Sequence, residues 1–274
     1  MLPGKLAYEH DLRGPSLYLS TTCSSFGYML NIAAHFLRTS DLDNVLLLSS
    51  NMELPESSPA LSQIISKDNS CRPFTLHRDG SIAGRGYGGV LLSTSTSTQF
   101  SSNKSCEIEL LDCSVSTAGR ERASFGAPSR SAQLSNIRSS YRRAGISPAA
   151  CVYTEAHGTG TVIGDAIEAR VLREVFETVR EPVWIGSAKE HVGHLDATAG
   201  LASICRVVNS FSGGLIPTSL PRNVASQDFD LLGPSLRLVP QSVEWPDSAV
   251  TGVHMVGFSG ASAHAIFRMR KETV

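Results

Sequence analysis

The fold of this chain is decided by residues 151–172, CVYTEAHGTGTVIGDAIEARVL. The segment opens with a short apolar run, turns at two glycines and two threonines, and continues with the spacing of a helix that faces a core. It therefore predicts a strand, a tight turn and a helix start, with His157 at the turn. Strands that alternate with helices favour a layered α/β fold with a mostly parallel sheet.

Two further segments repeat this pattern. Residues 16–37 (SLYLSTTCSSFGYMLNIAAHFL) place Cys23 at the turn, and residues 183–208 (VWIGSAKEHVGHLDATAGLASICRVV) place His194 there. In an open α/β sheet, ligands bind outside the carboxyl ends of the strands. One cysteine and two histidines can therefore converge on one pocket. A thiolate nucleophile with acid/base or oxyanion partners points to acyl chemistry.

The remaining elements are predicted from apolar runs and turn residues. We expect a strand buried on both faces at 44–50, a strand at 106–116, a helix over 129–144 that ends at Gly145, and paired strands around a turn at 257–261. The alternating pattern restarts near residue 106. We therefore expect two related halves, residues 1–105 with the cysteine and residues 106–274 with the two histidines.

Composition excludes several classes of function. The 274 residues are 41% hydrophobic and 18% charged with a net charge of −1, so neither nucleic acid nor an anionic membrane surface is expected as a partner. No apolar run approaches the roughly 20 residues that span a bilayer. The six cysteines have irregular spacing without a C-x-x-C pair, which argues against a disulfide framework. The first residues lack the build of a signal peptide, and a cytoplasmic location is the expected default.

Cys23 lies where a strand is predicted to give way to a helix. Ser24 and Ser25 are candidate caps for that helix. A thiol at a helix N-terminus has a lowered pKa, and the free N–H groups there can bind an oxyanion. The alternative is a small buried hydrophobic residue, which is common for free cysteine.

His157 lies in TEAHGTGT, where glycines let the backbone approach a ligand closely. Thr159 and Thr161 offer hydroxyls to a polar ligand arm, and the alternative is a histidine bonded within its own loop. Asp165 and Glu168 have the spacing of a helix N-cap and its N3 partner, and capping is the interpretation that we favour for Asp165.

The histidines also allow a metal interpretation, which we disfavour. His157, His191 and His194 could be zinc ligands, but no helical H-x-x-x-H pair or cysteine partner accompanies them. The glycines of GRGYGG at 84–89 precede a strand instead of following one, so a dinucleotide site is not expected.

Taken together, these motifs resemble the β-ketoacyl synthase family, most closely the ketosynthase domains of polyketide synthases. The matching pieces, in chain order, are LRGPS, TTCSS, CRPF, the glycine-rich stretch Asp79–Gly88, EAHGTGT, GDAIE, Lys189–His194 with its Lys-x-x-x-Gly-His pattern, and GFSGASAH. The resemblance implies the thiolase-like fold, two related halves in an α/β/α/β/α arrangement of layers.

The resemblance also implies roles for individual residues. Cys23 matches the acyl-accepting nucleophile, and His157 and His194 match the pair that promotes decarboxylation of a malonyl-type extender. The other matches are the supporting Lys189 and Glu168, the oxyanion-hole N–H groups of Cys23 and Phe258, and the pantetheine-contacting hydroxyls of Thr159 and Thr161. No permanently bound cofactor or metal is implied, because the substrate is carried as a phosphopantetheine thioester on acyl carrier protein or coenzyme A.

The same resemblance suggests partners. Family members dimerise through the strand that leads to the cysteine, here SLYLS at 16–20, so a homodimer or a complex with a larger polyketide synthase is expected. The chain begins just upstream of LRGPS, so we expect the N-terminal half of the fold to be incomplete and an edge of its sheet to need covering.

Several positions depart from the family pattern. Ala166 stands where the family has proline, and Glu190-His191 stand where it has Ser-Asn. The family's GFGGTNAH is altered at Ser259, Ala261 and Ser262. Three functions follow as alternatives: a condensing acyltransferase; a thiolase-fold enzyme that transfers, hydrolyses or cyclises a polyketide acyl group; and a non-catalytic partner of a synthase.

Overall fold

The computed structural model describes residues 2–52, 64–94, 106–219 and 231–271. Its helices are α1 (Leu2–Glu9), α2 (Ser25–Thr39), α4 (Arg130–Ala144), α5 (Val162–Val175), α6 (Lys189–Val192) and α7 (Ala199–Ser212). Its strands are β1 (Asn44–Asn51), β2 (Gly86–Ser93), β3 (Cys106–Thr117), β4 (Cys151–Glu155), β5 (Val183–Gly186), β6 (Leu215–Ile216), β7 (Leu236–Leu238), β8 (Val243–Glu244), β9 (Ser248–Val256) and β10 (Ala261–Lys271).

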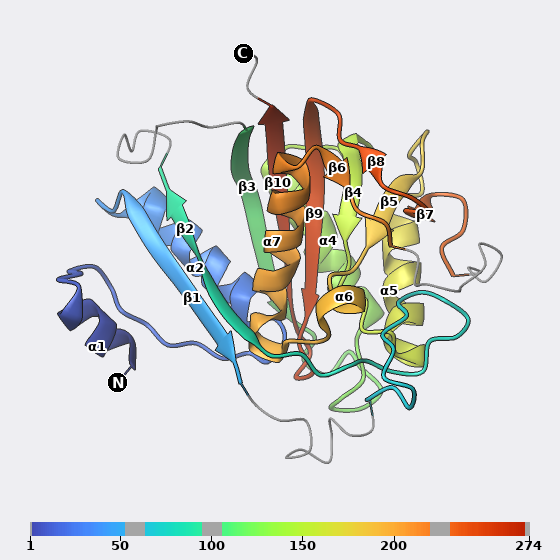
Figure 1. Ribbon diagram of the computed structural model, residues 1–274, viewed down its shortest axis with the longest axis horizontal. Coiled ribbons are helices and arrows are strands. Elements are labelled where there is room, and N and C mark those ends of the chain that lie inside the picture. Colours follow the sequence, from blue (N-terminus) through green and yellow to red (C-terminus); the bar gives the residue numbers. More distant parts are fainter. Residues whose placement is uncertain (1, 53–63, 95–105, 220–230, 272–274) are drawn as a thin grey trace.

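The centre of the molecule is a six-stranded sheet of order β3-β10-β9-β4-β5-β7 (Figure 1). Strands β9, β4, β5 and β7 run parallel to one another, whereas β3 and β9 flank β10 in antiparallel orientation. The predicted pair of strands around the turn at 257–261 is confirmed as the β9–β10 hairpin. The sheet is mixed instead of mostly parallel, because this hairpin and β3 supply its antiparallel half.

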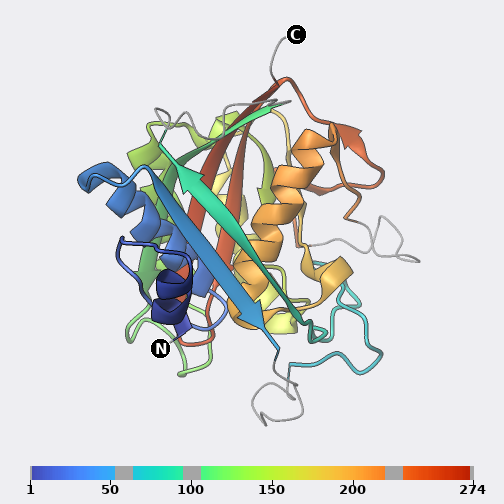
Figure 2. The same ribbon diagram turned by 60° about the vertical axis from the view of Figure 1, so that its left-hand side comes forward.

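Helices cover both faces of this sheet. α2 and α7 lie on one face, α4 and α5 lie on the other, and the two-stranded ladder β1–β2 lies outside α2 and α7 (Figures 1 and 2). The described chain is therefore stacked as ladder, helices, sheet and helices. This is the expected layered α/β architecture, and four of its layers are described.

Each face of the sheet has its own hydrophobic core. Phe26 of α2 and Leu201 of α7 meet Val253 of β9 on one side. On the other side, Ile137 of α4 and Leu172 of α5 pack toward β5 and β10. Strand β4 contributes side chains to both cores, Tyr153 to the first and Cys151 to the second, as expected of a strand buried on both faces.

The prediction that residues 44–50 are buried on both faces is wrong. β1 pairs only with β2, and the side chains of Leu46 and Leu48 remain 51% and 48% exposed. Leu46 faces Leu91 across the ladder, so apolar side chains from both strands share this outer face. Leu47, one position away, points inward and is buried.

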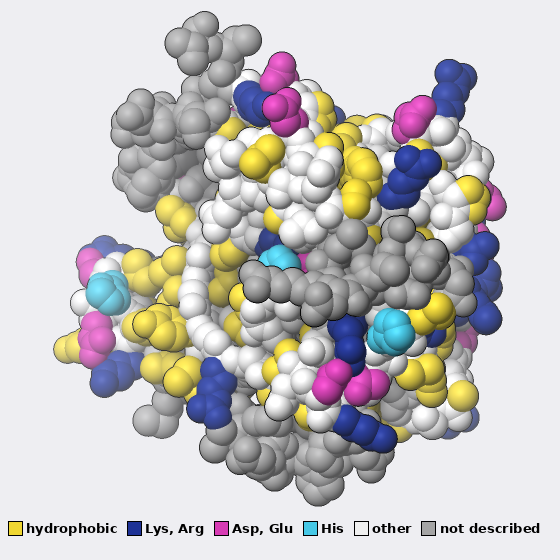
Figure 3. Space-filling view, turned by 45° about the vertical axis from the view of Figure 1, so that its right-hand side comes forward, with side chains coloured by type: hydrophobic (Ala, Val, Ile, Leu, Met, Phe, Trp, Pro, Cys, Tyr) yellow, Lys and Arg dark blue, Asp and Glu magenta, His cyan; other side chains and the backbone are white. Residues whose placement is uncertain are grey.

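The strand predicted at 16–20 is also absent from the described structure. These residues run as an extended segment without a ladder, and Leu17 and Tyr18 are exposed. An apolar run becomes a strand only where a neighbouring strand pairs with it, and no described segment does so here. Exposed hydrophobic side chains also gather near the N-terminal end of the chain, at the left of Figure 3.

Helix α4 was predicted correctly at both ends. The hydroxyl of Ser129 accepts a hydrogen bond from the N–H of Ala132, and Gly145 ends the helix in a left-handed conformation with φ of 65°. The division of the chain into halves at 105/106 stays a prediction, because residues 95–105 lie outside the described residues.

Candidate active site

Cys23 lies in a strained turn immediately before α2. The preceding Thr22 has a φ of 55°, a conformation that β-branched residues rarely adopt. The hydroxyl of Ser25 accepts a hydrogen bond from the N–H of Thr21 at 2.8 Å and donates one to the carbonyl of Thr22 at 2.6 Å. Ser24 occupies the N-cap position of α2 without a side-chain capping bond. The serines therefore brace the turn rather than cap the helix as predicted.

The predicted lowering of the Cys23 pKa is wrong. Burial, together with the nearby carboxylate of Asp196, raises the pKa of the Cys23 thiol to about 12. The thiol donates a hydrogen bond to Asp196 Oδ1 over 3.2 Å. Lys189 and the backbone N–H of Phe258 act in the opposite direction. The hydrogen bond with the Phe258 backbone places that N–H beside the sulfur.

His157 is held by a buried carboxylate. It follows β4, and Glu168 of α5 accepts hydrogen bonds from the N–H groups of His157 at 2.7 Å and Gly158 at 2.8 Å. Glu168 is therefore neither a capping partner nor a free surface acid. Burial raises the pKa of its carboxyl, while these two N–H donors lower it.

Asp165 holds the same loop from a second position. Its carboxylate accepts hydrogen bonds from the N–H groups of Gly160 at 3.1 Å and Phe74 at 2.7 Å. The N-cap of α5 is Thr161, so the capping interpretation of Asp165 is wrong. Gly160 has a φ of 73°, and a Cβ there would meet the carbonyl oxygen of Gly80 at 2.5 Å. The glycine-rich pattern of EAHGTGT is thus required for close backbone packing.

His194 is fixed through its backbone by the stretch Asp79–Gly88. The His194 N–H donates to the carbonyl of Ile82 at 2.6 Å, and its own carbonyl accepts from the N–H of Gly84 at 2.9 Å. The Gly80 N–H also donates to the carbonyl of Gly160 at 2.9 Å. One segment therefore supports both histidine loops, which gives its glycines a role in place of a dinucleotide site.

The ring of His194 has a defined tautomer. Its Nδ1 accepts a hydrogen bond from the N–H of Asp196 at 3.2 Å, so the ring proton of the neutral imidazole lies on Nε2. Asp196 thereby contacts both His194 and Cys23. It has a φ of 44°, a second left-handed residue next to the reactive groups.

The imidazole rings of His157 and His194 lie side by side. The ring centroids of His157 and His194 are 5.5 Å apart with nearly perpendicular planes. Burial and the charge of Lys189 lower the pKa of His157 well below its usual value and that of His194 to about 3. Both residues are only half-buried. They are therefore neutral hydrogen-bond donors at physiological pH and can be reached by a ligand.

Lys189 begins α6 and is buried. Burial lowers its pKa, while the negative charges of Glu155 and Glu168, and of Cys23 when it ionises, favour the protonated lysine. The structure thus brings Cys23, His157, His194, Lys189 and Glu168 into one electrostatically coupled site. Thr159 and Thr161 lie beside it, with their hydroxyls 3.0 Å apart.

The structure gives no support to a metal interpretation. Within the described ranges, no set of three His, Cys, Asp or Glu side chains is arranged to hold a metal ion. All six cysteines are described, and none forms a disulfide. Among the described helices, none is long and apolar enough to cross a membrane.

Comparison with known proteins identifies the family. The model of the β-ketoacyl synthase N-terminal domain matches residues 1–97, and the model of the C-terminal domain matches residues 108–223. The chain belongs to the β-ketoacyl synthase family. Its fold is accordingly thiolase-like, which confirms the fold expected from the sequence.

Several relatives of this β-ketoacyl synthase chain are polyketide synthases. It is 32% identical over 281 residues to the phenolphthiocerol/phthiocerol polyketide synthase of Mycobacterium tuberculosis, covering 99% of this chain and 15% of that protein. It is 31% identical to a highly reducing polyketide synthase of Didymella fabae, covering 97% and 14%.

Solved ketosynthase domains share the same architecture. The oxazolomycin ketosynthase domain of Streptomyces albus JA3453 superimposes with a TM-score of 0.89 at 27% identity, covering 99% of this chain and 49% of that one. The ketosynthase from module 1 of the bacillaene synthase of Bacillus amyloliquefaciens FZB42 gives 0.88 at 26%, covering 99% and 50%. This chain spans about half the length of these domains and about a seventh of the two synthases above.

The sequence motifs did not point to several residues that shape this ketosynthase-like site. Asp196 contacts Cys23, and its place two positions after His194 was the only available signal. Arg206 of α7 forms a buried ion pair with Glu155 of β4. The lone basic residue in the otherwise apolar run LASICRVV could have indicated a buried partner.

Proposed function

We propose that this chain is a ketosynthase-like acyltransferase that forms an acyl-enzyme on Cys23 and then joins it to a malonyl-type extender. The observation that carries the proposal is the convergence of Cys23, His157 and His194 from three separate loops with Lys189 from the start of α6. Both imidazoles are neutral there, as donation to an enolate requires.

The first half-reaction transfers an acyl group. The Cys23 sulfur attacks the carbonyl carbon of an acyl thioester, a new C–S bond forms, and the pantetheine thiol leaves with the proton that the Cys23 thiol gives up. The backbone N–H groups of Cys23 and Phe258 stabilise the tetrahedral oxyanion. The contact of the Phe258 N–H with the sulfur supports this assignment.

The second half-reaction makes the carbon–carbon bond. A malonyl thioester loses CO₂, and the electron pair of the broken bond forms an enolate. His157 and the Nε2–H of His194 donate hydrogen bonds to its oxygen. The enolate carbon then attacks the acyl-Cys23 carbonyl, and the Cys23 thiolate leaves. Lys189 favours the developing negative charge, and Glu168 holds the His157 loop.

The substrate is proposed to arrive on a phosphopantetheine arm from acyl carrier protein or coenzyme A. The paired hydroxyls of Thr159 and Thr161 offer polar contacts to the amides of that arm, and the exposed side chains of Val162 and Ile163 offer an apolar rim. A homodimer or a complex with a larger synthase is proposed as the assembly. No permanent cofactor is needed for this chemistry.

The contact between Cys23 and Asp196 favours a second candidate, decarboxylation without condensation. A thiol held in its neutral form beside a carboxylate is a weak nucleophile. The histidine pair and Lys189 do not depend on that thiol. Such a protein would release CO₂ from a malonyl thioester, and the resulting enolate would take a proton from solvent to give an acetyl thioester.

Intact-protein mass spectrometry separates the candidates. Wild type and Cys23→Ala are incubated with a panel of acyl-pantetheine thioesters, and CO₂ release from malonyl-pantetheine is measured in parallel. An adduct on wild type alone, with CO₂ release and a β-keto product, supports condensation. CO₂ release that survives in Cys23→Ala, without an adduct, supports the second candidate. If wild type forms no adduct and releases no CO₂, both candidates are overturned, and the remaining alternative is a non-catalytic partner.

A further inference from the structure

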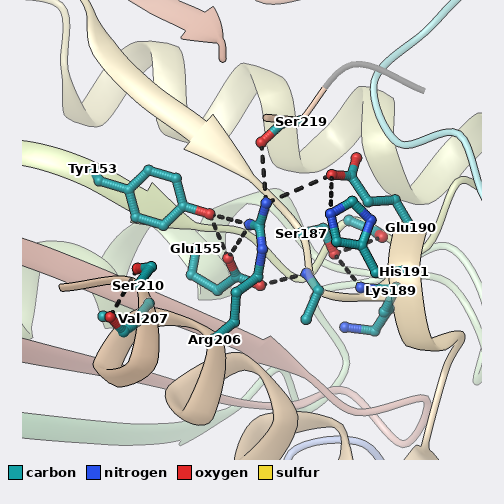
Figure 4. Close-up of polar contacts among 12 residues, drawn as sticks. Tyr153, Glu155, Ser187, Lys189, Glu190, His191, Arg206, Val207, Ser210 and Ser219 are labelled. Carbon is teal, nitrogen blue, oxygen red and sulfur yellow. Dashed lines mark hydrogen bonds and ion pairs between the residues drawn. The ribbon is translucent and has the colours of Figure 1, made fainter. Parts of the chain in front are cut away.

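A second buried charge cluster lies beside the proposed active site (Figure 4). Its centre is the guanidinium of Arg206, whose side chain projects from α7 and is only 9% exposed. Two carboxylates from different elements face this guanidinium, Glu155 from β4 and Glu190 from α6. Neither carboxylate belongs to the proposed reaction.

The first contact joins Arg206 to the beginning of α6. Arg206 Nη1 donates to Glu155 Oε2 at 2.8 Å, and Glu155 Oε1 accepts a hydrogen bond from the Ala188 N–H at 2.6 Å. Ala188 is the N-cap of α6, so the next residue is Lys189. Tyr153 adds a second acceptor for Arg206 Nη1 and donates its own hydroxyl to Glu155 at 2.5 Å.

The second contact lies immediately after Lys189. Glu190 is 4% exposed, and its Oε1 lies 3.5 Å from both Arg206 Nη2 and His191 Nε2. At that separation Oε1 accepts no hydrogen bond from the described residues. Burial raises the pKa of Glu190 to about 8. Arg206 Nη2 also donates to the Thr218 carbonyl and the Ser219 hydroxyl after β6.

This cluster costs free energy, because burying a charge pair is often no better than burying apolar side chains of the same size. The cluster instead serves to fix the geometry of α6. α6 has four residues, too few to hold a helical conformation by its own hydrogen bonds. Arg206 therefore anchors both sides of Lys189 to β4, α7 and the segment after β6.

We propose that Arg206 is a positioning residue for Lys189. It acts through Glu155 and Glu190, and it sets the placement of the lysine ammonium against the histidine pair and Cys23. This inference rests on the proposed function, since Lys189 matters for stabilising the enolate. Arg206 itself touches neither the substrate nor the reacting atoms.

The test compares Arg206→Met, which keeps the apolar stem, with Arg206→Lys, which keeps the charge but cannot reach both carboxylates. A misplacement of about 1 Å can lower a rate on the order of 100-fold. We therefore expect Arg206→Met to lower kcat for CO₂ release by roughly ten- to 100-fold, with KM nearly unchanged and a clearly smaller loss in the rate of Cys23 acylation. Arg206→Lys should recover part of the loss.

A second readout does not depend on activity. Lys189 lowers the pKa of Cys23, so a displaced Lys189 should move the pH midpoint of Cys23 alkylation upward. The rate is followed by mass spectrometry of the peptide that contains Cys23. The matched control is Arg143→Met, which removes another arginine from a buried carboxylate, Asp112, on the far side of the sheet. It should lower the melting temperature without changing either readout.

The outcomes distinguish a failure of the proposed function from a failure of the positioning role of Arg206. Wild type that neither releases CO₂ nor forms an adduct refutes the proposed function, while the alkylation midpoint still reports whether Arg206 positions Lys189. An active wild type with an unchanged midpoint and unchanged CO₂ release in a folded Arg206→Met overturns the positioning role. Equal losses of acylation and CO₂ release overturn it too, because they indicate a general structural defect.

Discussion

At the scale of single residues, burial keeps the reactive groups neutral. It raises the pKa of the Cys23 thiol and lowers the pKa of both imidazoles. For His157 and His194 this favours the form that donates hydrogen bonds to an enolate. For Cys23 it works against the thiolate, and the Asp196 carboxylate adds to that effect.

Asp196→Asn should make Cys23 more reactive. The change removes a negative charge beside the sulfur, so the pKa of the thiol falls, although its burial persists. We expect the pH midpoint of Cys23 alkylation to drop by about one unit, which corresponds to roughly tenfold faster alkylation near pH 8. The control is Asp247→Asn at an exposed position. An unchanged or higher midpoint would show that Asp196 does not restrain the thiol.

The two imidazoles should stay neutral well below the usual histidine pKa near 6.5. We expect ¹⁵N ring signals of His157 and His194, assigned with single asparagine variants, to remain those of neutral rings at about pH 5.5. His194 should show the tautomer with its proton on Nε2, because Nδ1 accepts from the Asp196 N–H. Titration of either ring between pH 6 and 7 would contradict this prediction.

At the scale of elements, the site is held by short segments that brace one another. α6 carries Lys189, and the Asp79–Gly88 stretch fixes the backbone of His194 and the His157 loop. None of these segments has a core of its own. Their geometry depends on glycines that allow close backbone approach and on the buried carboxylates of Asp165, Glu168 and Glu155.

Gly84→Ala should lower catalysis without unfolding the protein, because it disturbs the contact between the Asp79–Gly88 stretch and the segment before His194. A Cβ there would meet the Val192 carbonyl oxygen at 2.4 Å and crowd Gly193, which precedes His194. We expect CO₂ release to fall by roughly tenfold while acylation of Cys23 persists. Gly145→Ala is the control, because that Cβ would meet no atom within 4 Å. It should cost only about 1 kcal/mol of stability. Equal CO₂ release by the two variants would show that the Asp79–Gly88 stretch does not position His194.

Glu190→Gln should stabilise the fold in a pH-dependent way. The folded pKa of Glu190 is raised by burial to about 8, so folding takes up a proton between the unfolded pKa near 4.5 and pH 8. The free energy of unfolding of wild type therefore falls as pH rises through this window, and glutamine removes that loss. In thermal melts, the melting temperature of Glu190→Gln should rise relative to that of wild type as the pH increases from 5 to about 8. A constant difference at every pH would contradict this linkage.

At the scale of the whole molecule, the main sheet is covered by helices on both faces, whereas the β1–β2 ladder has an open outer face. Leu46, Leu48, Tyr87 and Leu91 are exposed there and belong to two paired strands. A contiguous apolar face of this kind usually takes part in association.

The double variant Leu46→Lys with Leu48→Lys should weaken any self-association of the chain. Each lysine adds charge to the apolar outer face without filling a buried position, so the melting temperature should change little. Light scattering at micromolar concentration measures the effect on mass. A wild type that is already monomeric, or a double variant of unchanged mass, would show that this face does not mediate self-association.

The sequence alone determined the elements whose signals are local. The histidine turn after β4, the capped helix α4 and the β9–β10 hairpin follow from apolar periodicity and from glycines at fixed offsets. The motifs around Cys23, His157 and His194 also identified the family. These features need only neighbouring residues, so a single sequence carries them.

Only the tertiary structure decided the environment of those residues. Cys23 and Asp196 are 173 positions apart in the chain, and Arg206 meets Glu155 across 51 positions. The absence of a strand at 16–20 and the exposure of one face of β1 likewise depend on which strands lie beside these segments. A pKa, a buried ion pair or an open sheet edge is set by three-dimensional neighbours, and the order of residues along the chain does not specify these directly.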